Sequence, residues 1–256
     1  MSSTPPKSGG PARKSERFAG AGEEKTRQVR GIFSRVAGRY DLMNDMMSGG
    51  LHRLWKRSFI DSFAPKPGMH LLDVAGGTGD IAFRFLDAVR SQGRATVLDP
   101  NPAMLAEGER RASRRRDVDR LDWICAAAEA LPAPDRSADA YTIAFGIRNV
   151  TDMEAALAEA RRVLRFGSRF LCLEFCPQPA IAGLDRLYAR YSETVIPRLG
   201  RWVAGDAESY HYLVDSIRRF PDPDSFAQRI AKAGFKRVGY RLLSGGICAV
   251  HSGWKI

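Results

Sequence analysis

Apolar residues follow two alternating patterns from about residue 26 onward, and together they predict an α/β fold. Short apolar runs predict strands at residues 69–74, 95–98, 121–125, 138–144 and 169–175. Amphipathic helical patterns begin between these runs, at Asp80, Pro102 and Thr151. Strands and helices in alternation indicate a parallel sheet with helices on both faces.

Helical segments flank this alternating core. Apolar residues at helical spacing, among them Leu51, Leu54, Trp55 and Phe59, predict an N-terminal helical cap before the first strand. A helical insert over about 184–217, with a break at Pro197, is followed by a helix near 225–233. The last two strands, 237–243 and 247–254, flank a Ser-Gly-Gly turn typical of a hairpin. We therefore expect a seven-stranded, mostly parallel sheet with a C-terminal antiparallel hairpin.

The N-terminal residues differ from the rest of the chain in composition. They carry Ser, Pro, Gly and basic side chains and almost no apolar ones, so burial would not offset the entropy lost on ordering. We predict a disordered basic tail over 1–25 and a single domain over 26–256. An organelle-targeting peptide is the alternative, which the Pro and Gly content disfavours.

The first predicted strand runs into a glycine-rich turn, LLDVAGGTGD at residues 71–80. Glycines there let the backbone approach a ligand closely. The same loop fits a loose dinucleotide fingerprint, so alone it leaves an NAD(P)-dependent oxidoreductase open. Helix capping is the structural alternative for Thr78 and Asp80.

Two acids distinguish this loop from a simple dinucleotide site. Asp73, before the glycines, would repel a pyrophosphate but suits a ligand that carries an ammonium and a sulfonium. Asp99 ends the second strand, where a carboxylate can accept both hydroxyls of a ribose. A solvated turn acid is the alternative for Asp99. The combination resembles the S-adenosylmethionine site of the Rossmann-like methyltransferases, with Ala75 in place of the usual first glycine.

Four segments of the chain resemble the ubiquinone/menaquinone biosynthesis C-methyltransferase family, which belongs to the class I S-adenosylmethionine-dependent methyltransferases. They are residues 33–56, the loop 73–80, FGIRNV at 145–150 and the helical stretch 208–221, and the likeness covers about residues 26–255. The chain departs from the family's pattern at Ala127, Ala144 and Cys176, which stand where the family often has Asn, Ser and Ser. Side-chain hydrogen bonds to the cofactor are therefore not expected at the two alanines.

The resemblance implies methyl transfer from S-adenosylmethionine to a ring carbon of a polyprenylated benzoquinol or a demethylmenaquinol, without a metal. The implied cofactor-binding residues are Asp73, Gly77, Thr78, Gly79, Asp99, Ala127, Ala128 and Ala144. The implied catalytic residues are Arg148, Asn149 and Tyr40, and the implied substrate-binding residues are Asp41 and Asn44.

Several of these residues have a structural alternative. Arg148 can hold an oxyanion or form a surface salt bridge, and Asn149 can orient a water or cap a helix. Tyr40 can contact the ring or simply fill the core. The run Ala126–Ala128 can leave room for the adenine or begin a helix.

Charge and cysteine usage bear on partners and compartment. With 40 Lys and Arg against 29 Asp and Glu, the net charge is +11, which favours an anionic partner: nucleic acid or an acidic membrane face. An added RNA-binding domain and the Asn-Pro-Pro-Tyr motif of exocyclic-amine methyltransferases are both missing, which disfavours a nucleic-acid methyltransferase. Four cysteines without a CxxC pair favour a reducing compartment.

Basic residues gather in two places. The run at 109–117 is typical of a solvated helix end, whereas Arg186, Arg190, Arg198 and Arg201 alternate with aromatic residues, as at a membrane interface. Helix core or a dimer contact is an equal interpretation of the second set. We expect a lipid quinol substrate, peripheral contact with the inner membrane from the cytoplasmic side (the matrix side if mitochondrial), no nucleic acid, and a homodimer or a quinone-biosynthesis complex as open possibilities.

Overall fold

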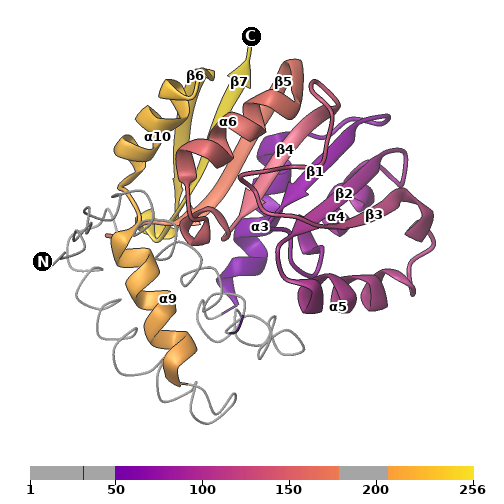
Figure 1. Ribbon diagram of the computed structural model, residues 1–256, viewed down its shortest axis with the longest axis horizontal. Coiled ribbons are helices and arrows are strands. Elements are labelled where there is room, and N and C mark those ends of the chain that lie inside the picture. The colour runs from indigo at the N-terminus through magenta and orange to yellow at the C-terminus, as the bar shows by residue number, and fades with distance from the viewer. Residues whose placement is uncertain (1–30, 32–49, 179–206) are drawn as a thin grey trace, which may run out of the picture.

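A seven-stranded sheet with helices on both faces forms the centre of the molecule (Figure 1). The computed structural model describes residue 31 and residues 50–178 and 207–256. The strands are β1 (His70–Val74), β2 (Arg94–Asp99), β3 (Leu121–Cys125), β4 (Ala138–Ala144), β5 (Leu164–Phe175), β6 (Lys236–Leu243) and β7 (Cys248–Lys255). The helices are α3 (Leu51–Phe63), α4 (Asp80–Ala88), α5 (Pro102–Ala112), α6 (Met153–Val163), α9 (Ala207–Arg219) and α10 (Pro223–Lys232), with 3₁₀ turns η2 (Val118–Arg120), η3 (Ile147–Asn149) and η5 (Ser244–Gly246).

The strand order β3-β2-β1-β4-β5-β7-β6 confirms the predicted fold class. Strands β1 to β5 pair in parallel, and β7 lies antiparallel between β5 and β6, so the terminal hairpin folds back into the sheet. The chain progresses outward from β1 through β2 to β3 and then crosses to β4 on the other side of β1. In open sheets of this kind, ligands bind beyond the carboxyl ends of the strands at such a crossing.

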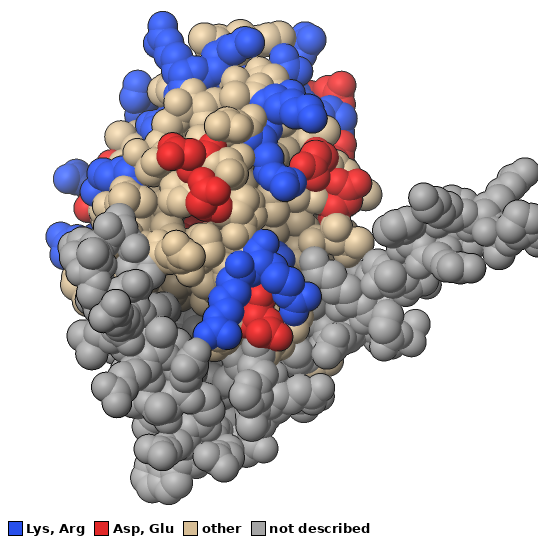
Figure 2. Space-filling model, turned by 90° about the vertical axis from the view of Figure 1, so that its left-hand side faces the viewer, with Lys and Arg blue, Asp and Glu red and all other residues tan. Residues whose placement is uncertain are grey.

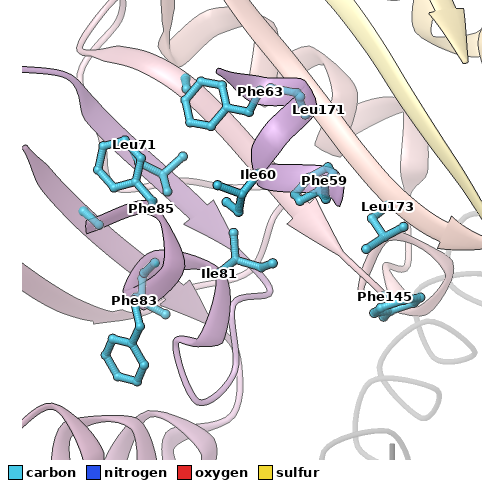
Figure 3. Packing of buried hydrophobic residues seen from close by; sticks show 14 of the residues in the cluster. Phe59, Ile60, Phe63, Leu71, Ile81, Phe83, Phe85, Phe145, Leu171 and Leu173 are labelled. Atoms are coloured by element: carbon cyan, nitrogen blue, oxygen red, sulfur yellow. The ribbon is translucent and has the colours of Figure 1, made fainter. Parts of the chain in front are cut away.

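Each face of the sheet has its own hydrophobic layer. On one face, Phe59 and Phe63 of α3 pack with Ile81 and Phe85 of α4 against the sheet (Figure 3). On the other face, residues of α6 and α10, including Leu157, Phe226 and Ile230, pack against Tyr141 and Phe170. The helix α3 therefore belongs to the core on the face that carries α4, and this contact brings it next to the glycine loop.

Predicted element boundaries differ from the structure where local burial is weak. Strand β5 begins at Leu164, five residues before the predicted start. The sequence does not predict this extension, because residues 165–167 are exposed and lack an apolar run. Helix α6 begins at Met153 after Asp152, whose side chain accepts from the Ala155 N–H. Leu51 and Leu54 fit the apolar spacing of the predicted helix, but their side chains are 37% and 61% exposed.

Some predictions fall outside the described residues. These are the tail at 1–25, the helical cap before residue 50, and the insert up to residue 206; α9 covers the end of that insert. Among the cysteines, Cys172, Cys176 and Cys248 are buried. Cys125 lies in the predicted strand 121–125, but it is exposed because β3 is an edge strand of the sheet. None of the described helices is long and apolar enough to cross a lipid bilayer.

Candidate active site

The loop between β1 and α4 has a backbone that requires small residues. Gly77 and Gly79 have φ values of +55° and +79°, in the left-handed region that glycine adopts without strain. A Cβ on Gly76 would lie 2.8 Å from the Asp73 backbone oxygen and 2.8 Å from its Oδ2. Ala75, with φ +51°, adopts the left-handed conformation without being glycine. The loop is thus closely packed on its own strand and presents backbone in place of side chains.

Asp73 connects the loop to the neighbouring strand. Its carboxylate is fully buried and accepts hydrogen bonds from the Thr142 hydroxyl, 2.9 Å away, and from the Ala82 N–H, 3.2 Å away. Thr142 lies directly opposite Asp73 in the parallel β1–β4 pair. Because the N-cap residue Gly79 has no side chain, Asp73 satisfies an N–H in the first turn of α4 in its place.

The charge state of Asp73 favours a cationic ligand. Burial raises the pKa of Asp73 to about 7, although the hydrogen bonds from Thr142 and Ala82 and the nearby charge of Lys56 lower it. Within the described part of the chain Asp73 forms no ion pair. A ligand that brings an ammonium to this carboxylate would add a positive charge in direct contact with it.

Asp99 is fixed beside the same loop. Its Oδ2 accepts from the Gly77 N–H at 2.9 Å and its Oδ1 from the Asn101 N–H at 2.8 Å. The residue is 8% exposed, so the interpretation as a solvated turn acid is wrong. The two acids Asp73 and Asp99 therefore stand on either side of the glycine loop, at the carboxyl ends of β1 and β2.

Thr78 and Asp80 do not act as helix caps. The N-cap residue of α4 is Gly79, which has no side chain that could form a cap hydrogen bond. Instead, Arg111 donates to the Thr78 hydroxyl at 2.7 Å, and the buried Lys56 amine pairs with Asp80 at 2.8 Å. Lys56 on α3 and Arg111 on α5 thus hold the loop from two other elements, and sequence analysis singled out neither, because a lone cation on a helix gives no signal of its partner.

The third segment of the predicted cofactor site is a loop and not a helix start. The Ala126 N–H donates to the Asp99 backbone oxygen at 3.2 Å, and residues 126–130 form a loop with a turn. Ala127 is half-buried and Ala128 is buried. Ala144, also half-buried, is the last residue of β4. Ala127 and Ala128 follow β3, and Ala144 ends β4. Asp73 is the second-to-last residue of β1 and Asp99 the last of β2, so all five lie at the carboxyl edge of the sheet.

Arg148 forms a buried ion pair and not the surface salt bridge that was its alternative. Its Nη1 lies 2.6 Å from Oε1 of Glu174, and the two side chains are 4% and 1% exposed. The same Nη1 donates to the Phe145 backbone oxygen at 2.7 Å. Burial raises the pKa of Glu174, whereas Arg148 and the Phe175 N–H lower it.

Asn149 has a partner on α9. The Tyr212 hydroxyl donates to its Oδ1 at 3.2 Å, while Asp152 caps α6, so the helix-cap alternative for Asn149 is wrong. Burial raises the pKa of Tyr212, and the nearby charge of Arg148 lowers it. Sequence reasoning did not assign a role to Tyr212 or Glu174, although Glu174 near the end of β5 has the same strand-end position as Asp73 and Asp99.

The turn that carries Arg148 touches the glycine loop. A Cβ on Gly146 would lie 2.5 Å from the Cβ of Ala75. The structure therefore brings together the loop, Asp99 and the Arg148–Asn149 turn at one edge of the sheet. Tyr40, Asp41 and Asn44 lie outside the described residues.

The residues present fit S-adenosylmethionine. Its ammonium matches the buried Asp73 carboxylate, which forms no ion pair within the described residues, its ribose matches Asp99, and Gly76, Gly77 and Gly79 leave only backbone at three positions of the loop. No group of three or more His, Cys, Asp or Glu side chains in the described segments could hold a metal ion.

Comparison with known proteins agrees with this arrangement. Residues 20–255 match the model of the ubiE/COQ5 methyltransferase family. A protein of Methylobacterium nodulans named ubiquinone/menaquinone biosynthesis C-methyltransferase UbiE is 60% identical over 237 residues, which cover 91% of this chain and 93% of that protein. The protein of the same name from Paracoccus denitrificans is 58% identical, with 92% and 94% covered.

Solved structures share the fold at low sequence identity. An S-adenosylmethionine-dependent methyltransferase from Aquifex aeolicus superposes with a TM-score of 0.58 at 15% identity, over 78% of this chain and 89% of that one. A possible histamine N-methyltransferase from Thermotoga maritima gives 0.59 at 21% identity, over 88% and 99%. Both place the chain among class I methyltransferase folds.

Proposed function

The chain belongs to the ubiE/COQ5 methyltransferase family, and from this membership we propose that it methylates a ring carbon of a polyprenylated quinol. The methyl donor is S-adenosylmethionine, and the acceptor is a 2-methoxy-6-polyprenyl-1,4-benzoquinol, a demethylmenaquinol, or both. The observation that carries the proposal is 60% identity over 91% of the chain to a protein named for this reaction. Neither relatives nor structural neighbours favour the oxidoreductase or nucleic-acid alternatives.

Donor binding is proposed for the residues that surround the glycine loop. Asp73 would hold the ammonium and Asp99 the two ribose hydroxyls, while Gly77, Thr78 and Gly79 present backbone to the ligand. Ala127, Ala128 and Ala144 would border the adenine and the donor without side-chain hydrogen bonds. The bound donor supplies a methyl group made electrophilic by the sulfonium.

The acceptor needs activation by the protein. An aromatic carbon becomes nucleophilic when a neighbouring hydroxyl loses its proton, so the reduced quinol and not the quinone is the proposed substrate. Arg148 would stabilise the ring oxyanion, and Asn149, held by Tyr212, would orient the ring or a water. Tyr40, Asp41 and Asn44 are proposed to contact the ring.

Peripheral binding to an anionic membrane is part of the proposal. A polyprenylated substrate resides in the bilayer, and the chain carries a net charge of +11. Lys and Arg side chains gather at the upper end of the face shown in Figure 2, but this end of the sheet is opposite the carboxyl ends of β1 to β5. The support for membrane binding is therefore the net charge and the lipid substrate, not this group of basic residues. We place the enzyme at the cytoplasmic face of the inner membrane, with a homodimer or a larger biosynthetic complex as further possibilities.

Transfer of labelled methyl groups tests the function. Purified protein is given labelled S-adenosylmethionine and either the methoxy-polyprenyl-benzoquinol or a demethylmenaquinol under anaerobic conditions. We expect methylated product from at least one quinol, none from the oxidised quinone, and at least 100-fold slower turnover for Arg148→Ala. Stabilisation against heat by NAD but not by S-adenosylhomocysteine would contradict the proposal.

A further inference from the structure

We propose that Glu174 is a catalytic residue of this methylation: its Oε2 takes the proton of the ring hydroxyl while Arg148 holds the oxyanion that remains. The inference rests on the proposed function. It assigns the proton acceptor to a protein carboxylate at the end of β5, a residue to which the sequence patterns gave no role.

The ion pair between Arg148 and Glu174 is formed by one nitrogen and one carboxylate oxygen. Nη1 of Arg148 donates to Oε1 of Glu174 and to the Phe145 oxygen, and Oε1 also accepts from the Phe175 N–H at 2.9 Å. By contrast, Nε of Arg148 and Oε2 of Glu174 are buried without a hydrogen-bond partner. An arginine and a carboxylate whose only purpose is mutual neutralisation would favour the two-pronged geometry, which satisfies both oxygens.

The two unpartnered atoms are complementary. Nε–H is a donor on the guanidinium, and Oε2 is an acceptor on the carboxylate. Nε shares its carbon with Nη1, and Oε2 shares its carbon with Oε1, the two atoms that form the contact. A hydroxyl group is the simplest partner for both, because its hydrogen donates to Oε2 and its oxygen accepts from Nε–H. Buried polar groups without partners are uncommon in folded proteins, which points to a ligand group at this place.

The pair also lies where the reaction would occur. Arg148 is on η3, directly after β4, and the adjoining Gly146 approaches Ala75 of the glycine loop. Glu174 is the second-to-last residue of β5. The carboxyl ends of β1, β4 and β5 are neighbours in the sheet, so ring oxygen and donor would meet at one edge.

Atoms and charge balance over the whole reaction. The O–H bond of the ring hydroxyl breaks and its proton bonds to Oε2, so the negative charge moves from Glu174 to the ring oxygen while Arg148 stays positive. The ring carbon then forms a bond to the methyl group, and the methyl–sulfur bond breaks with its electron pair left on sulfur. The methylated ring is then a neutral dienone, and Arg148 is the charged member of the pair. The ring carbon loses its hydrogen as a proton to water, which restores the oxyanion beside Arg148, and Glu174 returns its proton to the ring oxygen and becomes the counter-ion again.

The surroundings of Glu174 suit a base. Burial raises its pKa, which increases its proton affinity, and Arg148 lowers it, which keeps the carboxylate available. Among the described residues, the other titratable groups that interact with this pair are Cys172 and Cys176 on or after β5, Cys248 on β7, and Tyr212 on α9. Burial raises the pKa of all three thiols, so they stay neutral and leave Glu174 as the anion beside Arg148.

Glu174→Gln tests the assignment with almost no change of side-chain volume. We expect kcat to fall at least 100-fold, with the KM for S-adenosylmethionine unchanged and the acidic limb of the pH profile lost. Glu154→Gln is the matched control, because Glu154 also pairs with an arginine, Arg229 at 2.6 Å, but on the surface; it should behave as wild type. A Glu174→Gln enzyme that keeps more than a tenth of wild-type kcat would overturn the inference, whereas a wild-type enzyme inactive on every quinol would overturn the proposed function.

Glu174→Asp covers the case in which Glu174→Gln does not fold. Aspartate keeps the negative charge beside Arg148 but retracts the carboxylate by one methylene. A counter-ion role alone predicts activity within twofold of wild type, which would contradict the inference. A base held at a fixed distance from the ring predicts a loss of 10-fold or more.

Proton counting separates the base from a spectator carboxylate. The probe is a 4-nitrophenol with one prenyl group, bound with S-adenosylhomocysteine one pH unit below the pKa of the free phenol. In wild type we expect the absorbance of nitrophenolate and, by calorimetry in two buffers of different ionisation enthalpy, no released proton, since Glu174 retains it. Glu174→Gln should form the nitrophenolate and release one proton. Release of a proton by wild type, or binding of the neutral phenol, would refute the transfer to Glu174.

Discussion

Asp73 holds the glycine loop in the fold and is also the proposed partner of the ligand's ammonium, and pH distinguishes these two roles of its carboxylate. Its pKa of about 7 means that the carboxyl of the ligand-free protein is largely protonated in mildly acidic solution. An ammonium in contact with it favours the ionised form, so the bound state has a lower pKa than the free state. We expect the affinity for S-adenosylhomocysteine to be greatest above pH 7 and to fall by about tenfold per pH unit below it, until the carboxyl of the complex is protonated too.

Isothermal titration across this pH range measures the effect, and Asp73→Asn is its control. The amide carries no charge, and its oxygen can accept from the Ala82 N–H while its NH2 group donates to the Thr142 hydroxyl oxygen, which now acts as the acceptor. Its affinity should be weaker at high pH and nearly independent of pH. An equally flat profile for wild type would mean that Asp73 is not the group that receives the ammonium.

At the scale of elements, the close contact between α5 and β3 favours glycine over a larger residue at one position within α5. Gly108 lies in α5, and a Cβ on it would overlap the ring of Trp123. That ring is also confined by Gly79, where a Cβ would come within 2.6 Å, and by an edge contact with Phe83. Gly108→Ala should therefore destabilise the fold by about 1–3 kcal/mol through overpacking, although alanine is the better helix former by about 1 kcal/mol.

Chemical denaturation of Gly108→Ala and of Ala106→Gly measures this balance on one helix. Ala106 is exposed, so its replacement by glycine should cost about 1 kcal/mol through helix propensity alone. If Gly108→Ala is more stable than wild type, the Trp123 ring moves aside easily and the close approach of α5 to the loop is not required.

Elements were predictable where periodicity and turn residues agree. The strands β3 and β4 have the predicted boundaries, and α4 and α5 begin at the predicted Asp80 and Pro102. The early start of β5 was missed because exposed Phe166 and left-handed Gly167 give no strand pattern. Packing between elements is long-range, so the exposure of Leu54 could not be read from its helical spacing.

The whole molecule shows which part of the site a sequence can reveal. Asp73, Asp99 and the glycines are recognisable because strand ends and turns mark them locally. The partners of Asp80 and Arg148 are not, since Lys56 and Glu174 come from α3 and β5, and only the fold brings them near. The sequence shows which side chains are charged, but only the fold shows which of them are buried and therefore need a partner of opposite charge.

Net charge is a whole-molecule property, and it predicts how membrane binding depends on salt. At +11 the protein should sediment with vesicles that contain anionic lipid, bind neutral vesicles weakly, and lose binding as ionic strength shortens the Debye length. Removal of residues 1–25 lowers the net charge only to +9, because five Lys and Arg leave together with three Glu. The shortened protein should therefore retain both methyl transfer to a quinol and most of its vesicle binding. If binding to anionic vesicles disappears with these residues, the tail is the membrane anchor and the attraction does not belong to the domain at 26–256.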